Sequence, residues 1–555
     1  MQNFITKEGL VFYCYTIDTE QYRKIDAFLS ALQESGVEEI IQKASNEQKI
    51  GRPRVSPYAM FATILFGFAF GATTLRSLES SCRHDTRFIY LMDEEKPDYS
   101  TFSKFFNRVI LPHADEIFAA VTKAFLKICH VDIDECHIDG TKFEARSNKY
   151  KVVWKPTTFH LKLSAKVRGL LNLLGLSRGV PNEGFVPSAI LRGKIEDAQA
   201  LPLPSDKKEK KIRERQLQNL TDYLLKLIEY EEKESICGPD RNSYYKTDHD
   251  ATAMCLKEDY YSGLGSNFRA AYQMQIVVSH GFAVAYHVSQ DRADLYTFIP
   301  TLERFREMHG RLPKRITADA GYGCLDNYRY CQKNGIEAFV KYQAWEGECS
   351  GRRPALFELN NDESITCLGE QKGLATEVEG RHHKIRNGVF YRVQCPEDCP
   401  FMPYCRQWMK VPVATERVFE VNPEFQRLKQ EARDRLLSVT GIEQRVNRSC
   451  QVEGVYGITK YNMQYNRIRR VGMARAKAEF MLILLGLNTR KFLRCLEKKT
   501  SLVYWKAPEG LQPEKFKKPS AKRLANRVKK RRTKQPNEIA RDSYRHKSRA
   551  RKRER

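Results

Sequence analysis

The spacing of apolar residues divides the chain into a helical first part and a mixed second part. Apolar residues recur at helical spacing within residues 22–32, 58–68 and 102–110. Pro57 is expected to open the second of these helices and Gly71 to end it, and a Ser or Thr after Asp98 is expected to cap the third. These signals predict an all-α domain over residues 1–130.

From residue 131 the pattern changes to short apolar runs, which are typical of strands. Strands are expected at 132–139, 315–319 and 336–342, and at 273–279 and 282–289, where His280-Gly281 makes a hairpin turn. Helices are expected at 295–308 and 326–334. The predicted order is β, ββ, α, β, α, β, so the fold class is α/β.

Two segments interrupt this order. Residues 160–245 contain a charged helix with one apolar face, made by Leu217, Leu220, Leu224, Leu227 and Ile228. Residues 345–440 carry several cysteines and precede a last helical region that runs from Glu453 to Leu493. We interpret both segments as insertions into one domain, which would span residues 131–495.

The charge of the chain favours a polyanionic partner. Its 94 Lys and Arg against 68 Asp and Glu give a net charge of +26, which suits nucleic acid, although a ribosome or an anionic membrane surface would attract it too. If the partner is DNA, the helices predicted in residues 1–130 fit a helix-turn-helix. A helical packing domain without DNA contacts has the same pattern.

The end of the chain concentrates this charge. Residues 511–555 contain 19 Lys or Arg and four Asp or Glu, a net charge of +15. We expect residues 496–555 to form a basic tail that is disordered when free and holds phosphates without sequence preference.

No membrane partner is expected. The longest apolar run, Met60 to Ala72, is too short to cross about 30 Å of hydrocarbon as a helix. The first 25 residues lack the basic and apolar regions of a secretion signal. The expected location is the cytoplasm, in association with the nucleoid.

Three acids have the arrangement that metal-dependent phosphodiester chemistry needs. Asp139 and Asp319 are expected at strand ends before glycine-containing turns, and Glu453 at the start of the last helical region. Any one of them alone is more often a turn former. Together, on the first strand, the fourth strand and the helix after the fifth, they fit an RNase H-like sheet that gathers carboxylates around Mg²⁺ (or Mn²⁺). The glycine after Asp139 would let a phosphate backbone approach.

Basic residues follow the third acid. Lys460 is seven positions after Glu453, about 700° on a helix, so both side chains would face one way and Lys460 would meet a DNA phosphate. Spacing alone does not separate this from a surface lysine. Further candidate contacts with DNA are Arg448, Arg467, Arg469 and Arg470.

Several segments together resemble the DDE transposases of bacterial insertion sequences with an InsH-type N-terminal domain. They are Gly51-Arg-Pro-Arg to Arg108, His137-Ile-Asp-Gly-Thr-Lys-Phe-Glu-Ala, Thr247-Asp-His-Asp-Ala, Ala318-Asp-Ala-Gly-Tyr-Gly and Val452-Glu-Gly-Val-Tyr-Gly-Ile-Thr-Lys. The resemblance implies that Asp139, Asp319 and Glu453 are the catalytic acids and Lys460 the signature lysine. It also implies double-stranded DNA partners (element ends and target) and a homo-oligomer on DNA.

The chain departs from this resemblance at one place. Related enzymes often carry Tyr and Arg seven and four positions before the catalytic Glu, whereas this chain has Val446 and Ser449 there, with Arg448 one place early. That pair helps hold a flipped base at a DNA hairpin in some relatives. The hairpin route is therefore not assumed for this chain.

A second cluster consists of cysteines. Cys367, Cys395, Cys399 and Cys405 could supply four thiolates to a structural Zn²⁺, with His382 and His383 as spare candidates. Ordinary buried or surface thiols are the alternative, because the gaps are looser than in a paired CxxC site. Asp248 and Asp250 are interpreted as structural acids or as supports behind the metal ligands.

Three functions remain open from the sequence. The first is a transposase that cleaves DNA and transfers strands. The second is an RNase H-like nuclease that shares the same acids and never joins the cut end. The third is a DNA-binding protein with a decayed catalytic core, against which the three intact acids argue.

Overall fold

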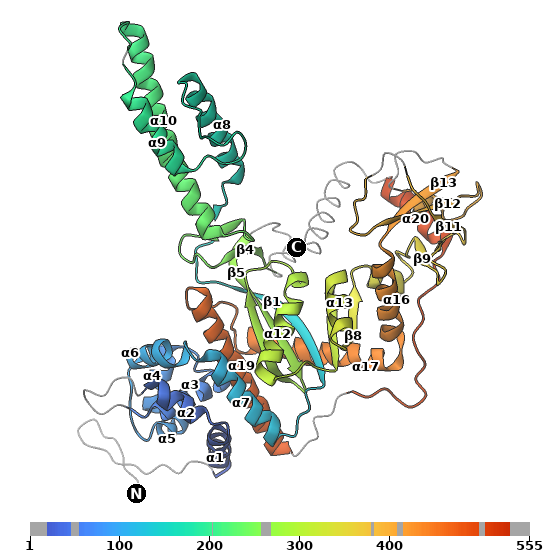
Figure 1. The fold of residues 1–555 in the computed structure, drawn as a ribbon. Helices are drawn as coiled ribbons and strands as arrows, with labels where there is room; N and C mark the ends of the chain where they lie inside the picture. The colour runs from blue at the N-terminus through green and yellow to red at the C-terminus, as the bar shows by residue number, and fades with distance from the viewer. Residues whose placement is uncertain are drawn as a thin grey trace. The chain divides into compact units, whose positions relative to one another are not determined.

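The computed structural model describes residues 19–45, 55–202, 204–256, 268–378, 382–407, 415–498 and 505–532 and has a mixed α/β fold (Figure 1). It divides into two compact units. The first comprises Met1–Thr141, Met274–Asn466 and Lys477–Arg555, and the second Lys142–Gln273 and Arg467–Ala476. Residues 1–18, for which no secretion signal was expected, and residues 533–555 of the tail lie outside the described residues.

The first part of unit 1 is helical throughout its described residues, and the three helices predicted there are present. Its elements are α1 (Thr19–Glu34), α2 (Val37–Ser45), α3 (Pro57–Phe70), α4 (Leu75–His84), α5 (Thr86–Leu91), α6 (Tyr99–Phe105), the π-helical η1 (Phe106–Ile110) and α7 (Ala114–Ile128).

Local signals set the ends of these helices. Pro57 opens α3, and Gly71 ends it at φ 99°, a left-handed conformation that suits glycine. The predicted Ser or Thr cap of the third helix is wrong. The side chain of Asp98 caps α6 instead, accepting a hydrogen bond from the Thr101 amide at 2.7 Å.

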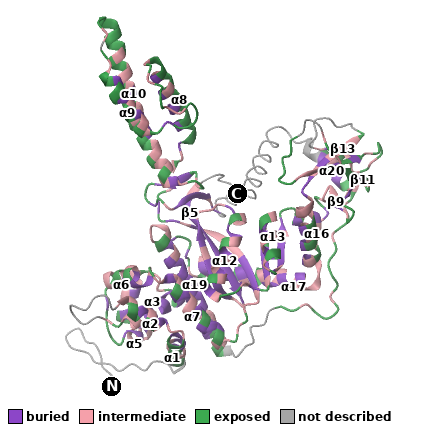
Figure 2. Ribbon diagram, in the orientation of Figure 1, coloured by how far each residue is buried: buried purple, intermediate pink, exposed green. Residues whose placement is uncertain are grey.

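Helix α3 lies in the core of unit 1, and all its residues from Met60 to Ala69 are buried (Figure 2). Gly486 of α19 (Met473–Lys498) lets the two helices approach closely, since a Cβ there would lie 2.7 Å from the Phe68 backbone. Within the described residues, no single helix is both long and apolar enough to cross a membrane. Helices α3 and α4 reach that length and composition only together, across a bend of 101°.

The main sheet has the strand order β6-β5-β1-β7-β8, and β4 (Thr252–Cys255) also pairs with β5. Its strands are β1 (Glu135–Glu144), β5 (Phe268–Ser279), β6 (Phe282–Ser289), β7 (Arg315–Gly323) and β8 (Glu337–Tyr342). β7 pairs in parallel with both β1 and β8. Helices α12 (Phe298–His309) and α13 (Leu325–Lys333) connect the later strands. All five predicted strands and both predicted helices are present, with ends displaced by a few residues.

Unit 2 contains the elements between β1 and β5. A two-stranded sheet of β2 (Val152–Trp154) and β3 (Ser243–Tyr245) carries α8 (Thr157–Leu173), α9 (Ser188–Ala200) and α10 (Lys207–Cys237). In α10, Leu220 and Leu227 are buried against α8 and α9, whereas Ile228 is exposed. Strand β4 (Thr252–Cys255) pairs with the first residues of β5 and was not predicted.

The cysteine-bearing segment after β8 forms a second, antiparallel sheet in unit 1. Its order is β13-β12-β11-β10-β9, from the strands β9 (Phe357–Leu359), β10 (Ile365–Cys367), β11 (Lys372–Ala375), β12 (Val389–Gln394) and β13 (Glu416–Val421). Helices α16 (Pro423–Leu437) and α17 (Val439–Arg448) follow it. The single helical region predicted from Glu453 to Leu493 is wrong, because residues 463–472 separate its two helical parts.

The described part of the basic tail is ordered against unit 1, so the expected disorder is wrong for residues 505–532. The ring of Phe516 contacts Trp345 at 5.2 Å between centroids. Glu514 pairs with Arg445 at 2.7 Å. Helix α20 (Ala521–Arg532) packs against α15 (Met402–Cys405) and buries Leu524. A prediction from net charge alone overlooks Phe516 and Leu524, the apolar residues that hold this segment in place.

Candidate active site

Asp139 and Asp319 lie side by side in register on two parallel strands. The pairing of β1 with β7 ends where His137 meets Thr317, so each acid follows two residues later. Both strands continue beyond the acids, so the expectation that the acids end their strands is wrong; only the pairing ends there. The side chain of Asp139 is 23% exposed. Asp319 and Glu453 are exposed and therefore open to a ligand.

Asp139 is held by both its side chain and its backbone. One carboxylate oxygen accepts a hydrogen bond from the Gly140 amide at 2.8 Å, and the other pairs with Arg448 at 3.0 Å. The hydroxyl of Tyr456 donates to the carbonyl of Asp139 at 3.0 Å. Burial raises the pKa of Asp139 to about 6, Arg448 and the Gly140 amide oppose the rise, and the charges of Asp294 and Asp319 add to it.

Arg448 is the residue around which the three predicted acids gather. Burial would lower the pKa of its guanidinium, yet the charges of Asp139, Asp319, Tyr322 and Glu453 raise it. Its Nε is buried and has no hydrogen-bond partner among the described residues. The guanidinium of Arg448 therefore interacts electrostatically with acids from three elements: β1, β7 and the helical segment after α17.

A π-helical segment explains why Arg448 stands one place early. Residues Ser449–Glu453 form the π-helix η3 between α17 and α18 (Gly454–Gly457). A π-helix hydrogen-bonds from i to i+5, so one turn accommodates one more residue than an α-helical turn. Arg448 and Glu453, five positions apart, therefore share a face, as residues four apart do in an α-helix.

Lys460 reaches the strand that carries the first acid. It lies in a second π-helical segment, η4 (Ile458–Asn462), and its Nζ donates to Thr141 Oγ1 at 2.7 Å. Thr141 is two residues after Asp139 on β1. The lysine therefore brings a positive charge to the edge of the acidic cluster.

A fourth acid, Asp294, lies at the same site and was missed from the sequence. It begins the 3-10 helix η2 (Asp294–Tyr296), and Gln275 donates to its carboxylate at 3.2 Å. A Cβ at Gly321 would lie 3.1 Å from Asp294 Oδ2, and one at Gly140 would lie 2.8 Å from its Oδ1. In the sequence, Asp294 looks like an ordinary acid that caps a helix. Nothing there indicated that it belongs to this site.

Protein side chains fill the space beside Gly140. A Cβ there would lie 2.0 Å from Gln275 Nε2, and Gln275 in turn accepts a hydrogen bond from the buried Tyr322 at 2.5 Å. The expectation that this glycine lets a phosphate backbone approach is therefore wrong. Its role is to admit Gln275 and Asp294.

The chemistry of these side chains suits a hard divalent cation. Carboxylate oxygens are the ligands that Mg²⁺ prefers, and two of the acids are exposed. As the side chains lie, no three His, Cys, Asp or Glu of the described residues are grouped closely enough to hold a metal ion. The Nε–H of Arg448, unpartnered among the described residues, is a hydrogen-bond donor and cannot bind a cation, so the fit rests on the carboxylates alone. The carboxylates at this site are therefore the type of ligand that Mg²⁺ prefers.

The three arginines after Lys460 belong to unit 2. Arg467 donates to the backbone carbonyls of Ala145 and Ser147 at 3.3 and 3.2 Å, which ties its segment to the end of β1. Burial lowers the pKa of Arg469, and it lowers that of Arg470 to about 10, with Arg475 adding to the shift. In the same unit, Asp248 and Asp250 accept hydrogen bonds from Tyr272 and from the Met473 amide, so both are structural.

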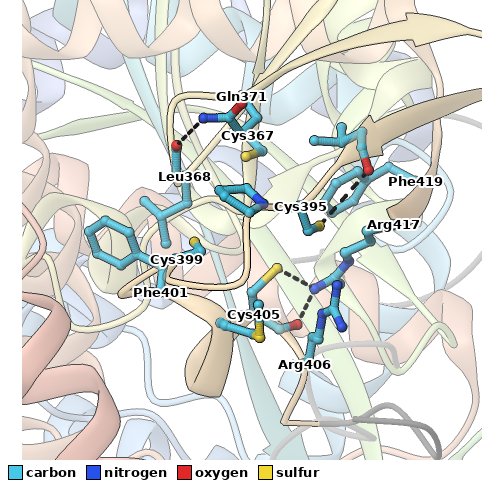
Figure 3. Close-up of a pocket in the computed structure, with 14 residues that line it drawn as sticks. Cys367, Leu368, Gln371, Cys395, Cys399, Phe401, Cys405, Arg406, Arg417 and Phe419 are labelled. Carbon is cyan, nitrogen blue, oxygen red and sulfur yellow. Dashed lines mark hydrogen bonds between the residues drawn. The ribbon is translucent and has the colours of Figure 1, made fainter. Parts of the chain in front are cut away.

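The four predicted zinc ligands line one pocket at the end of the second sheet (Figure 3). Cys367 ends β10, Cys395 follows β12, and Cys399 and Cys405 come from the next loop and α15. The spare histidine His383 lies elsewhere, stacked on Phe390 with a centroid distance of 4.5 Å. His382 does not line the pocket either.

Two transposase families match the chain. The family described as a transposase DDE domain matches residues 369–493, which include Glu453 and Lys460. The family described as a transposase domain (DUF772) matches residues 15–108, the region of helices α1 to α6. No curated protein and no solved structure matches the chain.

These matches, together with the mixed α/β fold, define a DNA transposase. The two family matches support an insertion-sequence DDE transposase. The match to the transposase DDE domain indicates a metal-dependent enzyme of DNA cleavage and strand transfer, which is consistent with DNA as its partner.

Proposed function

We propose that Asp139, Asp319 and Glu453 are the catalytic acids and together bind Mg²⁺ (or Mn²⁺). The observation that carries this proposal is their convergence on Arg448 from three elements far apart in the sequence. Strand order β6-β5-β1-β7-β8, with the first acid on the central strand and the second on its parallel neighbour, supports an RNase H-like core.

Each residue has its own part in the reaction. Asp139, Asp319 and Glu453 would hold the metal ion, which would activate an oxygen nucleophile and stabilise charge on the scissile phosphate. Asp139 must be deprotonated to act as a ligand, and Arg448 favours that state. Lys460, held by Thr141, neutralises a DNA phosphate beside the acids. Asp294 is a positioning residue that adds negative charge behind Asp139.

Residues 1–130 are proposed to recognise the element ends through a helix-turn-helix. Four residues including Gly71 separate α3 from α4, and the two helices cross at 101°. This agrees with the 90–120° and the short glycine-containing turn of that motif. Arg76 and Arg83 of α4 are exposed, and Arg83 also pairs with Glu79 at 2.9 Å. Because α3 is buried, α4 is the helix proposed to enter the groove.

The remaining assignments follow from this division. Residues 131–495 form the catalytic domain with insertions at about 160–245 and 345–440, and residues 496–555 add basic charge. Arg469 and Arg470 are proposed phosphate contacts, whereas the contacts of Arg467 favour a structural role. Because two element ends must meet one target, the enzyme is proposed to act as a homo-oligomer on nucleoid DNA.

A reaction of purified full-length protein with duplexes from both ends of its element and a target plasmid tests the proposal. Mg²⁺ should give cleaved ends joined to target, and EDTA should prevent both steps. Asp139→Asn, Asp319→Asn and Glu453→Gln should each lower cleavage by about 10⁴-fold, the scale of losing an essential catalytic group. DNA binding should remain.

The exposed Asp326 on α13 provides the matched control, and Asp326→Asn should cleave like the wild type. Cleaved ends that are never joined would identify a nuclease instead. Binding without cleavage would identify a decayed enzyme. Normal cleavage by any of the three variants would remove that acid from the site.

A further inference from the structure

The pocket at the end of the second sheet brings together four thiols that are distant in the sequence. Cys367 stands at the start of a tight turn in which the Glu370 amide bonds back to its carbonyl at 2.8 Å. The amide of Cys395 bonds to the Thr415 carbonyl at 2.7 Å, and that of Met402 to the Cys399 carbonyl at 3.1 Å. Backbone hydrogen bonds therefore fix the loops from which the sulfur atoms project.

The sulfur atoms lie around one hollow (Figure 3). A Cβ at Gly369 would lie 2.8 Å from Cys399 Sγ and 3.8 Å from Cys367 Sγ, so these two sulfurs flank one point. Cys395 and Cys367 are also close enough to Cys405 to act on its thiol electrostatically. All four are free thiols.

The rest of the lining favours a soft metal over a polar ligand. Leu368, Phe401, Met402 and Phe419 make it largely apolar. Burial raises the pKa of the Cys405 thiol, and the guanidinium of Arg417, which donates to both the sulfur and the carbonyl of Cys405, opposes that rise. Four thiolates without a further donor match a closed, tetrahedral structural zinc site.

We propose that Cys367, Cys395, Cys399 and Cys405 bind one structural Zn²⁺, and that this ion holds α15 in place for the basic helix α20. As the side chains lie, no three donors of the described residues are grouped for a metal. The ion would therefore gather the sulfurs by side-chain rotation within the hollow. Zinc binding of this kind contributes directly to folding.

The link to α20 is structural. Cys405 is the last residue of α15, and α20 packs on α15. Leu524 and Val528, four positions apart, are buried on one face of α20, and Arg527 donates to the Arg352 carbonyl at 2.7 Å. Away from that buried face, Lys522, Arg523, Arg527 and Lys529 of α20 are exposed. Zinc would thus fix a basic surface to the catalytic unit.

Metal analysis of full-length protein from zinc-supplemented cells tests the site. We expect about one zinc per chain, retained by Asp319→Asn, because the ion does not belong to the carboxylates. Cys399→Ser and Cys405→Ser should lose it, and Cys255→Ser, which alters a thiol outside the pocket, should keep it. Folded wild-type protein without zinc would overturn the proposal.

Two further measurements do not depend on the variants folding. Wild-type protein reloaded with Co²⁺ should show thiolate-to-cobalt charge-transfer absorption, and its absence would overturn thiolate ligation. Trypsin should cut within residues 521–532 several-fold faster after chelation of zinc. Equal cutting rates with and without zinc would overturn the docking role. Neither readout requires DNA cleavage, so both are independent of the proposed catalytic site.

Discussion

Arg448 directly precedes the π-helical segment η3 and Glu453 is its last residue, and the two interact electrostatically although they are five residues apart. In a regular α-helix five positions rotate by about 500°, which would turn the two side chains away from each other. The π-helical segment reduces this rotation and brings the two side chains to the same face of the helix. π-helical turns of this kind are frequent at functional sites.

Deleting Cys450 should therefore be tolerated. The deletion removes one residue from η3 and leaves Arg448 four positions before the acid, which an α-helical turn accommodates. We expect cleavage to stay within about tenfold of wild type, or ~1.4 kcal/mol in activation free energy. Gel-based cleavage of labelled element ends measures it.

Deleting Val446 is the matched control, because it lies in the regular helix α17. Its removal rotates the flanking segments by about 100° relative to each other and should abolish cleavage. A folded protein that lacks Cys450 and does not cleave would contradict the role given to η3.

Asp294→Asn should raise the Mg²⁺ concentration that half-maximal cleavage requires by several-fold, because the substitution removes a negative charge next to Asp139. Asn retains an oxygen for Gln275, so thermal stability should change little. Asp291→Asn, in the same loop but bonded to Ser289, serves as the control. An unchanged Mg²⁺ requirement would restrict Asp294 to a structural role.

The pKa of Asp139 predicts an acid limit for cleavage. Burial raises this pKa to about 6, and a carboxyl group binds metal only after losing its proton, so the rate should fall as the pH drops through that region. Arg448 opposes the rise. Arg448→Met should therefore move the acid limb of the pH–rate profile to higher pH, and Arg448→Lys should leave it nearly in place. Coincident profiles of all three proteins would contradict this coupling.

Much of the main sheet was predictable because its signals are local. The hairpin around His280 and Gly281 needs two consecutive positive φ angles, of 52° and 79°, and apolar strands flank it on both sides. The order of the three acids along the chain was enough to predict them, and the structure brings all three near Arg448, whereas their catalytic role stays a prediction. Short strands such as β9 and β10, three residues each, carry no usable periodicity and were missed.

The missed parts of the site depend on long-range packing. Asp294 resembles any helix-capping acid until Gly140 and Gly321 are seen to make room for it. The amino-acid composition of residues 449–453 does not indicate a π-helical segment. Phe516 and Leu524 are single apolar residues in a basic segment, and only their packing against Trp345 and α15 makes them anchors.

The basic tail should therefore behave as two parts. Deleting residues 533–555, which hold nine Lys or Arg and three Asp or Glu, should weaken DNA binding at low salt and leave thermal stability unchanged. Every phosphate that the shortened tail no longer binds should reduce the slope of log affinity against log salt by roughly 0.9 on duplex DNA. Recognition of the element ends should survive, since binding to phosphates carries little sequence information.

Deleting residues 511–555 should in addition destabilise the fold, because it removes Phe516 from Trp345 and uncovers α15. Phe516→Ala in the full chain isolates this part, with an expected loss of about 2 kcal/mol in the free energy of unfolding from the half-buried ring contact. Its salt slope should match that of the wild type, because no charge is removed. Denaturant unfolding and DNA titrations at several salt concentrations separate the two effects. Equal stability of both truncated proteins would show that residues 511–532 do not anchor the tail, and an unchanged salt slope in the shorter deletion would show that residues 533–555 do not touch DNA.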